Sequence, residues 1–232
     1  MSLKLNFYYP ASDYLSNWVN FDQPFTGELG HPNDLDSSEH HASIHDCLAK
    51  AAGNYGVARN FKSDASRIHR LDPLRTSLAS IASVPSSNED AINAVTTLVH
   101  SLKESYGKEL VSAASKFLWF RFKSPIVIYD SYAFEGLKRL GFVPNPKLFT
   151  DFAAWYAEYV DAWRTKFEDC ERQIEAACNE LSQFKKFTAA ATMSDGEINQ
   201  LAGGRWFRER VFDWYLTCIG EPDSRFDPFQ AQ

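Results

Sequence analysis

The residue types in this chain best suited to chemistry are a lysine and an aspartate on either side of a short apolar run. Lys116 lies among helix-forming and aromatic residues, and Asp130 directly follows the apolar residues 126–129. A carboxylate at the start of a helix is kept ionised and fixed by backbone N–H groups and by the helix dipole. Such an anion can stabilise positive charge developing on a sugar, or orient an attacking water. A lysine with a lowered pKa can instead attack the sugar and form a Schiff base.

The local pattern around these two residues predicts a helix, an extended segment and a second helix. Residues 112–122 carry apolar side chains at helical spacing, and Pro125 ends that helix because proline cannot continue it. Residues 126–129 are β-branched and aromatic, which predicts a short buried extended segment. Asp130 or Ser131 then caps a helix that ends at Gly141. In the purely structural alternative, Asp130 is only this cap and Lys116 is a surface lysine whose stem covers apolar neighbours.

The segment ASKFLWF, followed by PIVIYDSYA, resembles a group of bacterial proteins with an oxoguanine-DNA-glycosylase fold. These proteins are distant relatives of the helix-hairpin-helix DNA glycosylases. Their pattern joins a Ser-Lys pair, an apolar helix and an Ile-x-Asp-Ser turn, and the matching residues are Ser115, Lys116, Ile128, Asp130 and Ser131. The stretch GGRWFRERVFDWYLTCIG is similar to the closing helix of the group, at Arg208, Asp213 and Trp214. The resemblance is closest over residues 112–141 and looser over residues 105–220.

The resemblance implies a mainly α, helix-hairpin-helix glycosylase-like bundle with Asp130 at the place of the catalytic aspartate. It implies hydrolysis of the N-glycosidic bond of a damaged or modified base, with DNA as the partner and no cofactor. The family hairpin grips a DNA phosphate through a Gly-x-Gly turn, whereas this chain offers only Gly107. The nucleophilic lysine of bifunctional members would fall near Val111. The sequence therefore favours a monofunctional mechanism on Asp130, with Lys116 as a second candidate catalytic residue.

Basic residues gather in three places, at residues 59–75, 116–139 and 205–210, and would form a phosphate-binding face if they converge. A flipped base also needs aromatic side chains around it. The candidate DNA-binding residues are Gly107, Lys108, Ser115, Arg121, Lys123, Arg205 and Arg208. The candidate rings of the base pocket are Trp119, Tyr132, Trp206 and Trp214. Solvated helix faces are the alternative for the basic residues, and core packing is the alternative for the rings. Asp213 is expected to pair with an arginine such as Arg208, or to be a buried polar anchor.

Length and composition restrict the class of protein. The 232 residues allow one large domain or two small lobes, and 44% hydrophobic residues suffice for a packed core. The formal net charge of -6 weighs against a general nucleic-acid binder but leaves room for a local basic face. Four cysteines without paired spacing predict reduced thiols and a cytoplasmic location. The sequence lacks the pattern of a signal peptide or of a membrane span, so no membrane partner is expected.

The expected organisation is an irregular and helical N-terminal region over residues 1–85, a helical core over 86–222 and a loose tail over 223–232. Residues 1–40 are rich in proline and glycine and are expected to be irregular. Helices are expected at 43–52 and 73–82, with a helical turn at 65–71. Ser86 or Ser87 starts a helix over 91–106. With Gly107 and residues 108–122, that helix makes the helix-turn-helix pair that the hairpin motif needs.

The second half of the chain is expected to contain one long helix. Apolar residues recur at alternating spacings of three and four over residues 146–187, which would make a continuous helix of roughly 60 Å. The favoured prediction is a pair of core helices with a break near residues 166–172, and the alternative is an arm through which the chain forms a homo-oligomer. Residues 189–199 are predicted to be a linker. The final helix follows Gly203 and Gly204 and ends at residues 220–222.

Two other functions remain open alongside the glycosylase. The first is a catalytically inactive glycosylase-fold module that binds DNA or protein, with bacterial defence as its setting. The acidic net charge and the single glycine of the hairpin favour this function. The second is a metal-dependent hydrolase that uses His41 and His45, which lie four residues apart near Glu39, His40, Asp46 and Cys47. Because no distant ligands are evident, a polar helix start is preferred there, and no metal is expected.

Overall fold

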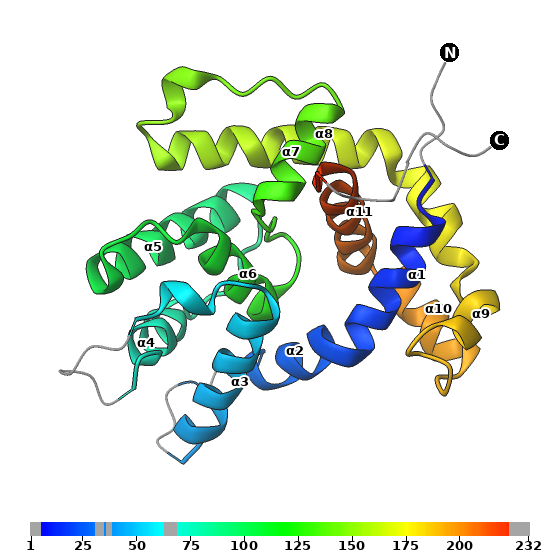
Figure 1. Ribbon diagram of the computed structural model, residues 1–232, viewed down its shortest axis with the longest axis horizontal. Coiled ribbons are helices and arrows are strands. Elements are labelled where there is room, and N and C mark those ends of the chain that lie inside the picture. The colour runs from blue at the N-terminus through cyan, green and yellow to red at the C-terminus, as the bar shows by residue number, and fades with distance from the viewer. Residues whose placement is uncertain (1–5, 31–34, 36–38, 63–68, 223–232) are drawn as a thin grey trace. The chain divides into compact units, whose positions relative to one another are not determined.

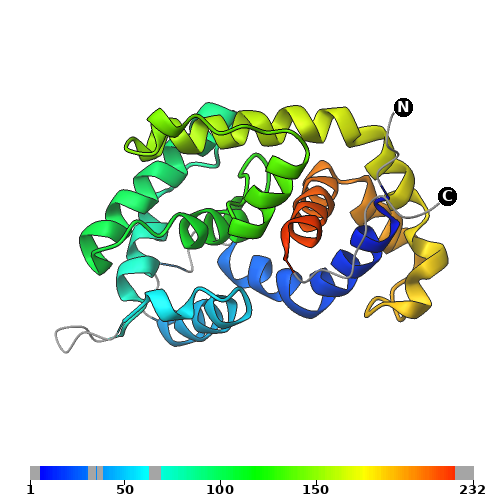
Figure 2. The same ribbon diagram turned by 45° about the horizontal axis from the view of Figure 1, so that its top comes forward.

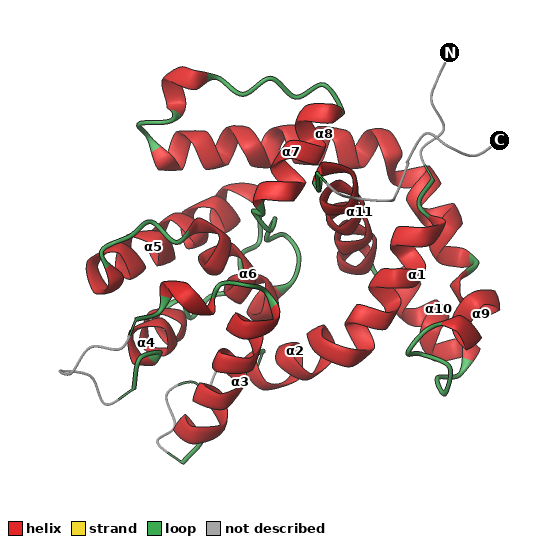
Figure 3. Ribbon diagram, in the orientation of Figure 1, coloured by secondary structure: helices red, strands yellow, loops and turns green. Residues whose placement is uncertain are grey.

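The computed structural model describes residues 6–30, 35, 39–62 and 69–222. Within these ranges every regular element is helical, and Figure 3 shows helices joined by loops. The mainly α fold class predicted from the sequence is therefore confirmed. None of the described helices is both long and apolar enough to cross a membrane.

The chain divides into two compact units. The terminal unit consists of residues 1–20 and 129–232, and the inner unit consists of residues 21–128. This division differs from the predicted boundary at residues 85–86, because the first helix packs with the C-terminal half of the chain rather than with the segment that follows it. The predicted tail, residues 223–232, lies outside the described residues.

The terminal unit is built around its last helix, α11 (Arg205–Gly220). Four helices pack against α11: α1 (Tyr8–Asn17), α7 (Ser131–Arg139), α8 (Phe152–Asn179) and α10 (Asp195–Gly203). Figure 1 shows α8 as the longest ribbon of this unit, with α7 lying against it. The short helix α9 (Leu181–Phe184) follows α8, and 3-10 turns lie at Pro146–Leu148 and Lys185–Phe187. The α11 residues that form the core are Phe207, Val211, Phe212, Tyr215 and Leu216.

Helices α7 and α11 approach each other so closely that their backbones touch. A Cβ atom on Gly136 would overlap the carbonyl oxygen of Leu216, and one on Gly220 would overlap the carbonyl oxygen of Tyr132. Both glycines are therefore required by the close approach of the two helices rather than by their backbone angles. This contact fixes the N-terminal end of α7, and with it the start of the helix that follows Asp130.

Gly220→Ala is expected to lower the free energy of unfolding by about 1–3 kcal/mol, because the added methyl group forces α7 and α11 apart. Urea unfolding would measure the change. Gly203→Ala is the matched control, because Gly203 ends α10 and a Cβ atom there meets nothing within 4 Å. That control should be neutral or slightly stabilising. Equal stability of the two variants would contradict the close helix contact.

The inner unit is built around α6 (Val111–Phe122). Residues 113–121 of α6 are buried, so this helix is covered on every side. Helices α2 (Gln23–Leu29) and α5 (Asn88–Tyr106) pack against it, while α3 (His41–Asn54) packs against α2 and α4 (Asp72–Ser80). Figure 2 shows α5 and α6 joined by a short turn. Aromatic rings fill the core of the unit, with edge-on contacts among Phe25, Tyr55, Phe61, Phe117 and Phe120.

Several helix ends follow the local signals in the sequence. Ser87 caps α5 and forms a capping box with Asp90, and Gly107 ends α5 in the left-handed conformation with φ of 71°. The predicted helix-turn-helix pair is therefore present, although α6 begins at Val111 rather than at residue 108. Residues 126–129 are not helical, and residues 126–128 are buried, as predicted. Residues 65–68 of the predicted helical turn lie outside the described residues.

The irregular structure predicted for residues 1–40 is wrong for the described part of that range. It contains α1, a π-helical turn at Trp18–Asp22 and α2. The prolines that suggested irregular structure, Pro10 and Pro24, both lie in the first turn of a helix, where the missing N–H is not needed. Buried apolar side chains, among them Leu15 and Leu29, then decide in favour of helix.

Two predictions for the second half of the chain are also wrong. Helix α8 runs without a break through residues 166–172 and ends at Asn179, because Phe167, Cys170 and Ile174 are buried and hold this stretch in the core. The predicted linker at 189–199 contains the start of α10, where Ser194 forms a capping box with Glu197. The apolar stripe of α8 is thus core packing within the terminal unit.

Candidate functional site

Asp130 lies where α7 begins and caps that helix, as the sequence predicts. Its Oδ1 accepts a hydrogen bond from the backbone N–H of Tyr132 at 3.0 Å, and Asp130 itself has extended backbone angles. The side chain is half-buried. The cap and the N-terminal end of the helix dipole both favour the ionised carboxylate. The site therefore holds a fixed negative charge with access to solvent.

Aromatic rings surround the residue before Asp130. The ring of Tyr129 meets Trp155 edge-on at 4.9 Å, Tyr159 at 5.3 Å and Phe134 at 6.1 Å between centroids. These residues come from α7 and from the first turns of α8, all within the terminal unit. We refer to Tyr129, Phe134, Trp155 and Tyr159 as the ring cluster. The ring cluster therefore gives Asp130 a largely apolar neighbour.

The phenols of the ring cluster remain neutral at physiological pH. Burial raises the pKa of Tyr129, and the negative charges of Asp130 and Glu135 raise it further. Burial also raises the pKa of Tyr159 well above its usual value, with smaller contributions from the charges of Asp213 and Asp130. The Asp130 charge is therefore felt at both phenols, which keep their protons and can act as hydrogen-bond donors.

Lys116, the second candidate catalytic residue, belongs to the inner unit and is buried in α6. Only 5% of the residue is exposed. Its Nζ donates a hydrogen bond to Ser112 Oγ at 2.8 Å and lies 5.8 Å from the centroid of the Tyr55 ring. The alternative that described Lys116 as a surface lysine is therefore wrong. Because α6 is apolar on all faces, a lysine on it has no exposed side to occupy.

The candidate DNA-binding residues fall into two groups. Gly107 and Lys108 are exposed at the turn between α5 and α6, and Lys123 is half-buried, with a pKa lowered by that burial. The other group is bound within the protein. Arg121 and Ser115 donate to backbone carbonyl oxygens, those of Leu78 and Val111 respectively. Arg205 and Arg208 form ion pairs, with Glu209 at 3.1 Å and with Glu175 at 3.0 Å. Asp213 is buried and pairs with an arginine, as predicted, although the partner is Arg210 rather than the suggested Arg208.

The predicted base-pocket rings occupy different environments. Trp119 is fully buried in α6, Trp206 packs on Trp18 at 4.6 Å, and the Trp214 indole donates to Asp13 at 2.8 Å. Tyr132 is 43% exposed and lies two residues after Asp130. Trp155 and Tyr159 are not among the rings predicted from the sequence, because the apolar residues of 146–187 are assigned there to core packing or to an oligomer arm. The available signal was the four-residue spacing of Trp155 and Tyr159, which places both on one face of α8.

The histidine group does not form a metal centre in the part of the chain that the structure describes. No set of three or more His, Cys, Asp or Glu side chains there is placed to hold a metal ion. The rings of His41 and His45 lie 6.3 Å apart, and His45 is bound to Asp72 instead. The metal-dependent hydrolase therefore lacks a ligand set among the described residues.

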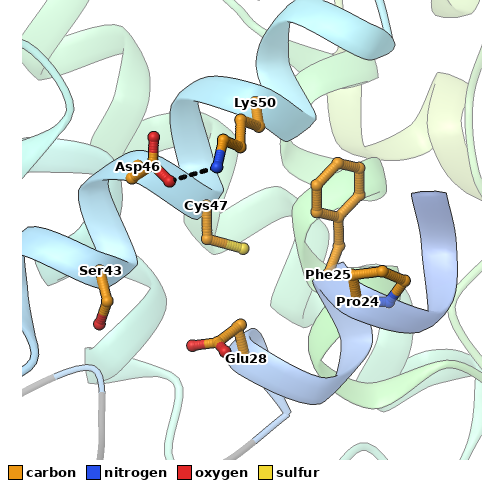
Figure 4. A pocket seen from close by; sticks show the side chains of 7 residues that line it. All are labelled: Pro24, Phe25, Glu28, Ser43, Asp46, Cys47 and Lys50. Carbon is orange, nitrogen blue, oxygen red and sulfur yellow. Dashed lines mark ion pairs between the residues drawn. The ribbon is translucent and has the colours of Figure 1, made fainter. Parts of the chain in front are cut away.

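A pocket of about 260 Å³ lies between α2 and α3 of the inner unit. Figure 4 shows its lining, which consists of Pro24, Phe25, Glu28, Ser43, Asp46, Cys47 and Lys50. Asp46 and Lys50 form an ion pair of 2.6 Å at its rim. Burial raises the pKa of Cys47 to about 12, so the thiol is protonated at neutral pH and is a poor nucleophile. The pocket offers a surface for binding rather than groups for covalent chemistry.

Comparisons with known proteins do not place the chain in a family. No family model matches the sequence. Neither the curated proteins nor the solved structures give a significant match.

Proposed function

We propose that this chain is a monofunctional DNA N-glycosylase that uses Asp130 to hydrolyse the N-glycosidic bond of a damaged or modified base. The observation that supports the proposal most is the placement of Asp130. Its carboxylate is held by a backbone N–H at the start of α7, is half-buried and adjoins the ring cluster. The resemblance of residues 112–141 to glycosylase-fold proteins points to the same residue.

The proposed chemistry needs a fixed anion and little else from the protein. As the bond between base and sugar lengthens, positive charge develops on the sugar ring, and a carboxylate held in place stabilises it without reorganising. The same carboxylate can accept a proton from the water that attacks the sugar. Asp130 is suited to both roles because its cap and the helix dipole keep it ionised. The neutral phenols of Tyr129 and Tyr159 add no competing charge.

A catalytically inactive module for binding DNA or protein is the second candidate. The ion pairs of Arg205 and Arg208 favour a protein-binding module over one that binds DNA, because they leave less positive charge for phosphates. The buried apolar stripe of α8 weighs against a protein-binding module that uses this helix, since Tyr156, Val160 and Phe167 already pack in the core. Base release distinguishes the two candidates.

The experiment that tests the proposal is the detection of free bases by mass spectrometry. Purified protein is incubated with duplex and single-stranded DNA that carries oxidised, alkylated, deaminated or phage-type modified bases. We expect release of one class of base, at a rate that depends on Asp130. Folded protein that releases no base from any of these substrates would contradict the glycosylase and leave the inactive module.

Tyr132→Ala is expected to lower kcat/KM for base release about tenfold. Tyr132 is the most exposed aromatic side chain in the vicinity of Asp130, and stacking of a base on an aromatic ring contributes about 1–3 kcal/mol. Single-turnover kinetics at varied DNA concentration would measure the change. Tyr8→Ala is the control, because Tyr8 has a similar exposure of 44% on α1. A similar loss in both variants would remove Tyr132 from the site.

A further inference from the structure

A group of titratable side chains in the inner unit joins α3 to the start of α4. His45 Nε2 lies 2.8 Å from Asp72 Oδ1. The rings of His45 and His69 stack, with centroids 4.0 Å apart and an angle of 19° between the planes. The side chain of His45 is only 13% exposed. Two imidazoles are therefore in contact, and one of them is bound to a carboxylate. A proton added to one ring would place a positive charge against the other.

Hydrogen bonds couple this stack to the backbone around it. The backbone N–H of Leu71 donates to Nδ1 of His69 at 3.2 Å, so that nitrogen has to be unprotonated. Arg75 lies 3.5 Å from Asp72 and also donates to the carbonyl oxygen of Leu35. The group therefore links residues 69–72 to α3 and to the carbonyl group of Leu35. A proton on His69 Nδ1 would remove the acceptor that holds Leu71.

The charges that face His45 oppose one another. Asp72 attracts a proton to His45, while His69 and Arg75 repel it, and His41 is the next ring at 6.3 Å. Burial is the largest influence and lowers the pKa of His45 despite Asp72. Burial raises the pKa of Asp72, but its partners His45 and Arg75 together lower it by more, so the net shift is downward. Asp72 therefore stays ionised through the pH range in which histidine titrates.

The sign of the pH effect follows from proton counting. Because the pKa of His45 is lower in the folded chain, the unfolded chain binds more protons near pH 6. The stabilisation from this group is present above the ordinary histidine pKa of about 6.5 and is lost as the pH falls through that value and below it.

We propose that the His45–His69 stack is a proton-operated clamp between α3 and the start of α4. When both rings are neutral, the stack holds residues 69–72 on α3. A proton that enters the stack at His45 places a largely buried positive charge against the His69 imidazole and near the Arg75 guanidinium. The edge of the inner unit formed by α3 and α4 then opens, while α5 and α6 stay folded. The clamp does not depend on the chemistry proposed for Asp130.

Hydrogen–deuterium exchange of the full chain at pH 7.5 and pH 5.5, corrected for the intrinsic pH dependence of exchange, tests the clamp. We expect protection in peptides covering residues 41–54 and 69–80 to be lower at pH 5.5 than at pH 7.5, because His45 takes up a proton more readily in the opened chain. Protection in α5 and α6 should stay constant. A uniform loss across the inner unit, or no loss in α3 and α4, would overturn the proposal.

His45→Phe and His100→Phe are the matched variants. Phenylalanine at position 45 keeps a ring against His69 but cannot take a proton, so the pH response that follows from His45 should disappear even if basal protection is lower. His100 is exposed on α5, and its replacement should leave the response as in the wild type. An NMR titration of the wild-type histidine Cε1–H signals needs no variant. His45 should titrate below the ordinary histidine pKa of about 6.5, and titration of His45 at or above that value would overturn the clamp.

Discussion

Asp130→Asn is expected to slow base release strongly and to leave the fold intact. Asparagine keeps the shape of the side chain and can still accept the hydrogen bond from the Tyr132 N–H, but it carries no negative charge. If Asp130 stabilises charge on the sugar, the rate should fall about 100- to 1000-fold, as when other preorganised electrostatic groups are removed. Asparagine and aspartate are equally good helix caps, so the free energy of unfolding should change little. Single-turnover base release and urea unfolding measure the two quantities.

The chain contains a matched control for this substitution. Asp151 caps α8 in the same manner, with Oδ1 accepting from the backbone N–H of Ala154 at 3.2 Å. Asp151→Asn removes one negative charge from a helix start elsewhere in the terminal unit. We expect it to release base at the wild-type rate. An equal loss in both variants would show that the removal of any one negative charge from the terminal unit lowers activity, whatever its position, and full activity of Asp130→Asn would exclude Asp130 from catalysis.

The features predicted correctly from the sequence are those fixed by neighbours within three or four residues. Ser87 and Asp90 mark the start of α5, Gly107 marks its end, and Asp130 marks the start of α7. Each signal is a hydrogen bond or a backbone angle that depends only on residues close together in the sequence. Such signals are readable without knowledge of the rest of the fold.

The wrong predictions concern segments whose structure is decided by distant contacts. Pro10 and the glycines after it suggested an irregular start, yet α1 forms because Tyr14 and Leu15 bury against α11, nearly 200 residues away in the sequence. The predicted break in α8 failed for the same reason, since burial of Phe167 and Ile174 maintains the helix. Local propensity is a weak guide where tertiary packing supplies most of the helix stability.

The candidate site was predictable only in part. Asp130 and Tyr132 lie in one local motif, whereas Trp155 and Tyr159 reach the ring cluster from α8. The basic residues were predicted less well, because their clustering in the sequence indicates a charged surface even where a side chain is buried. Arg121 lies on a helix that is apolar on all faces, a pattern that already indicates burial. A buried arginine then finds an internal acceptor, here the carbonyl oxygen of Leu78.

Glu209→Leu is expected to lower the free energy of unfolding by about 3–5 kcal/mol, because it breaks a buried ion pair and leaves a buried charge behind. Glu209 of α11 accepts from Arg164 of α8, and the two side chains are 4% and 9% exposed. Arg205 also contacts this carboxylate, but Arg205 is half exposed and can turn to solvent. Urea unfolding followed by circular dichroism would measure the loss. Glu135→Ala, in the exposed pair with Lys138, is the control and should change stability by at most about 1 kcal/mol.

The double variant Arg164→Met with Glu209→Leu distinguishes a buried charge from lost packing. If the single substitution destabilises by stranding the Arg164 guanidinium, removal of both charges should restore most of the stability, since apolar pairs often replace buried ion pairs without loss. If Glu209 matters through its shape in the contact between α8 and α11, the double variant should be no more stable than the single one. Recovery of stability in the double variant would show that the single variant is destabilised by the unpaired charge of Arg164. The ion pair would then compensate for the burial of an arginine in α8 rather than add stability to the fold.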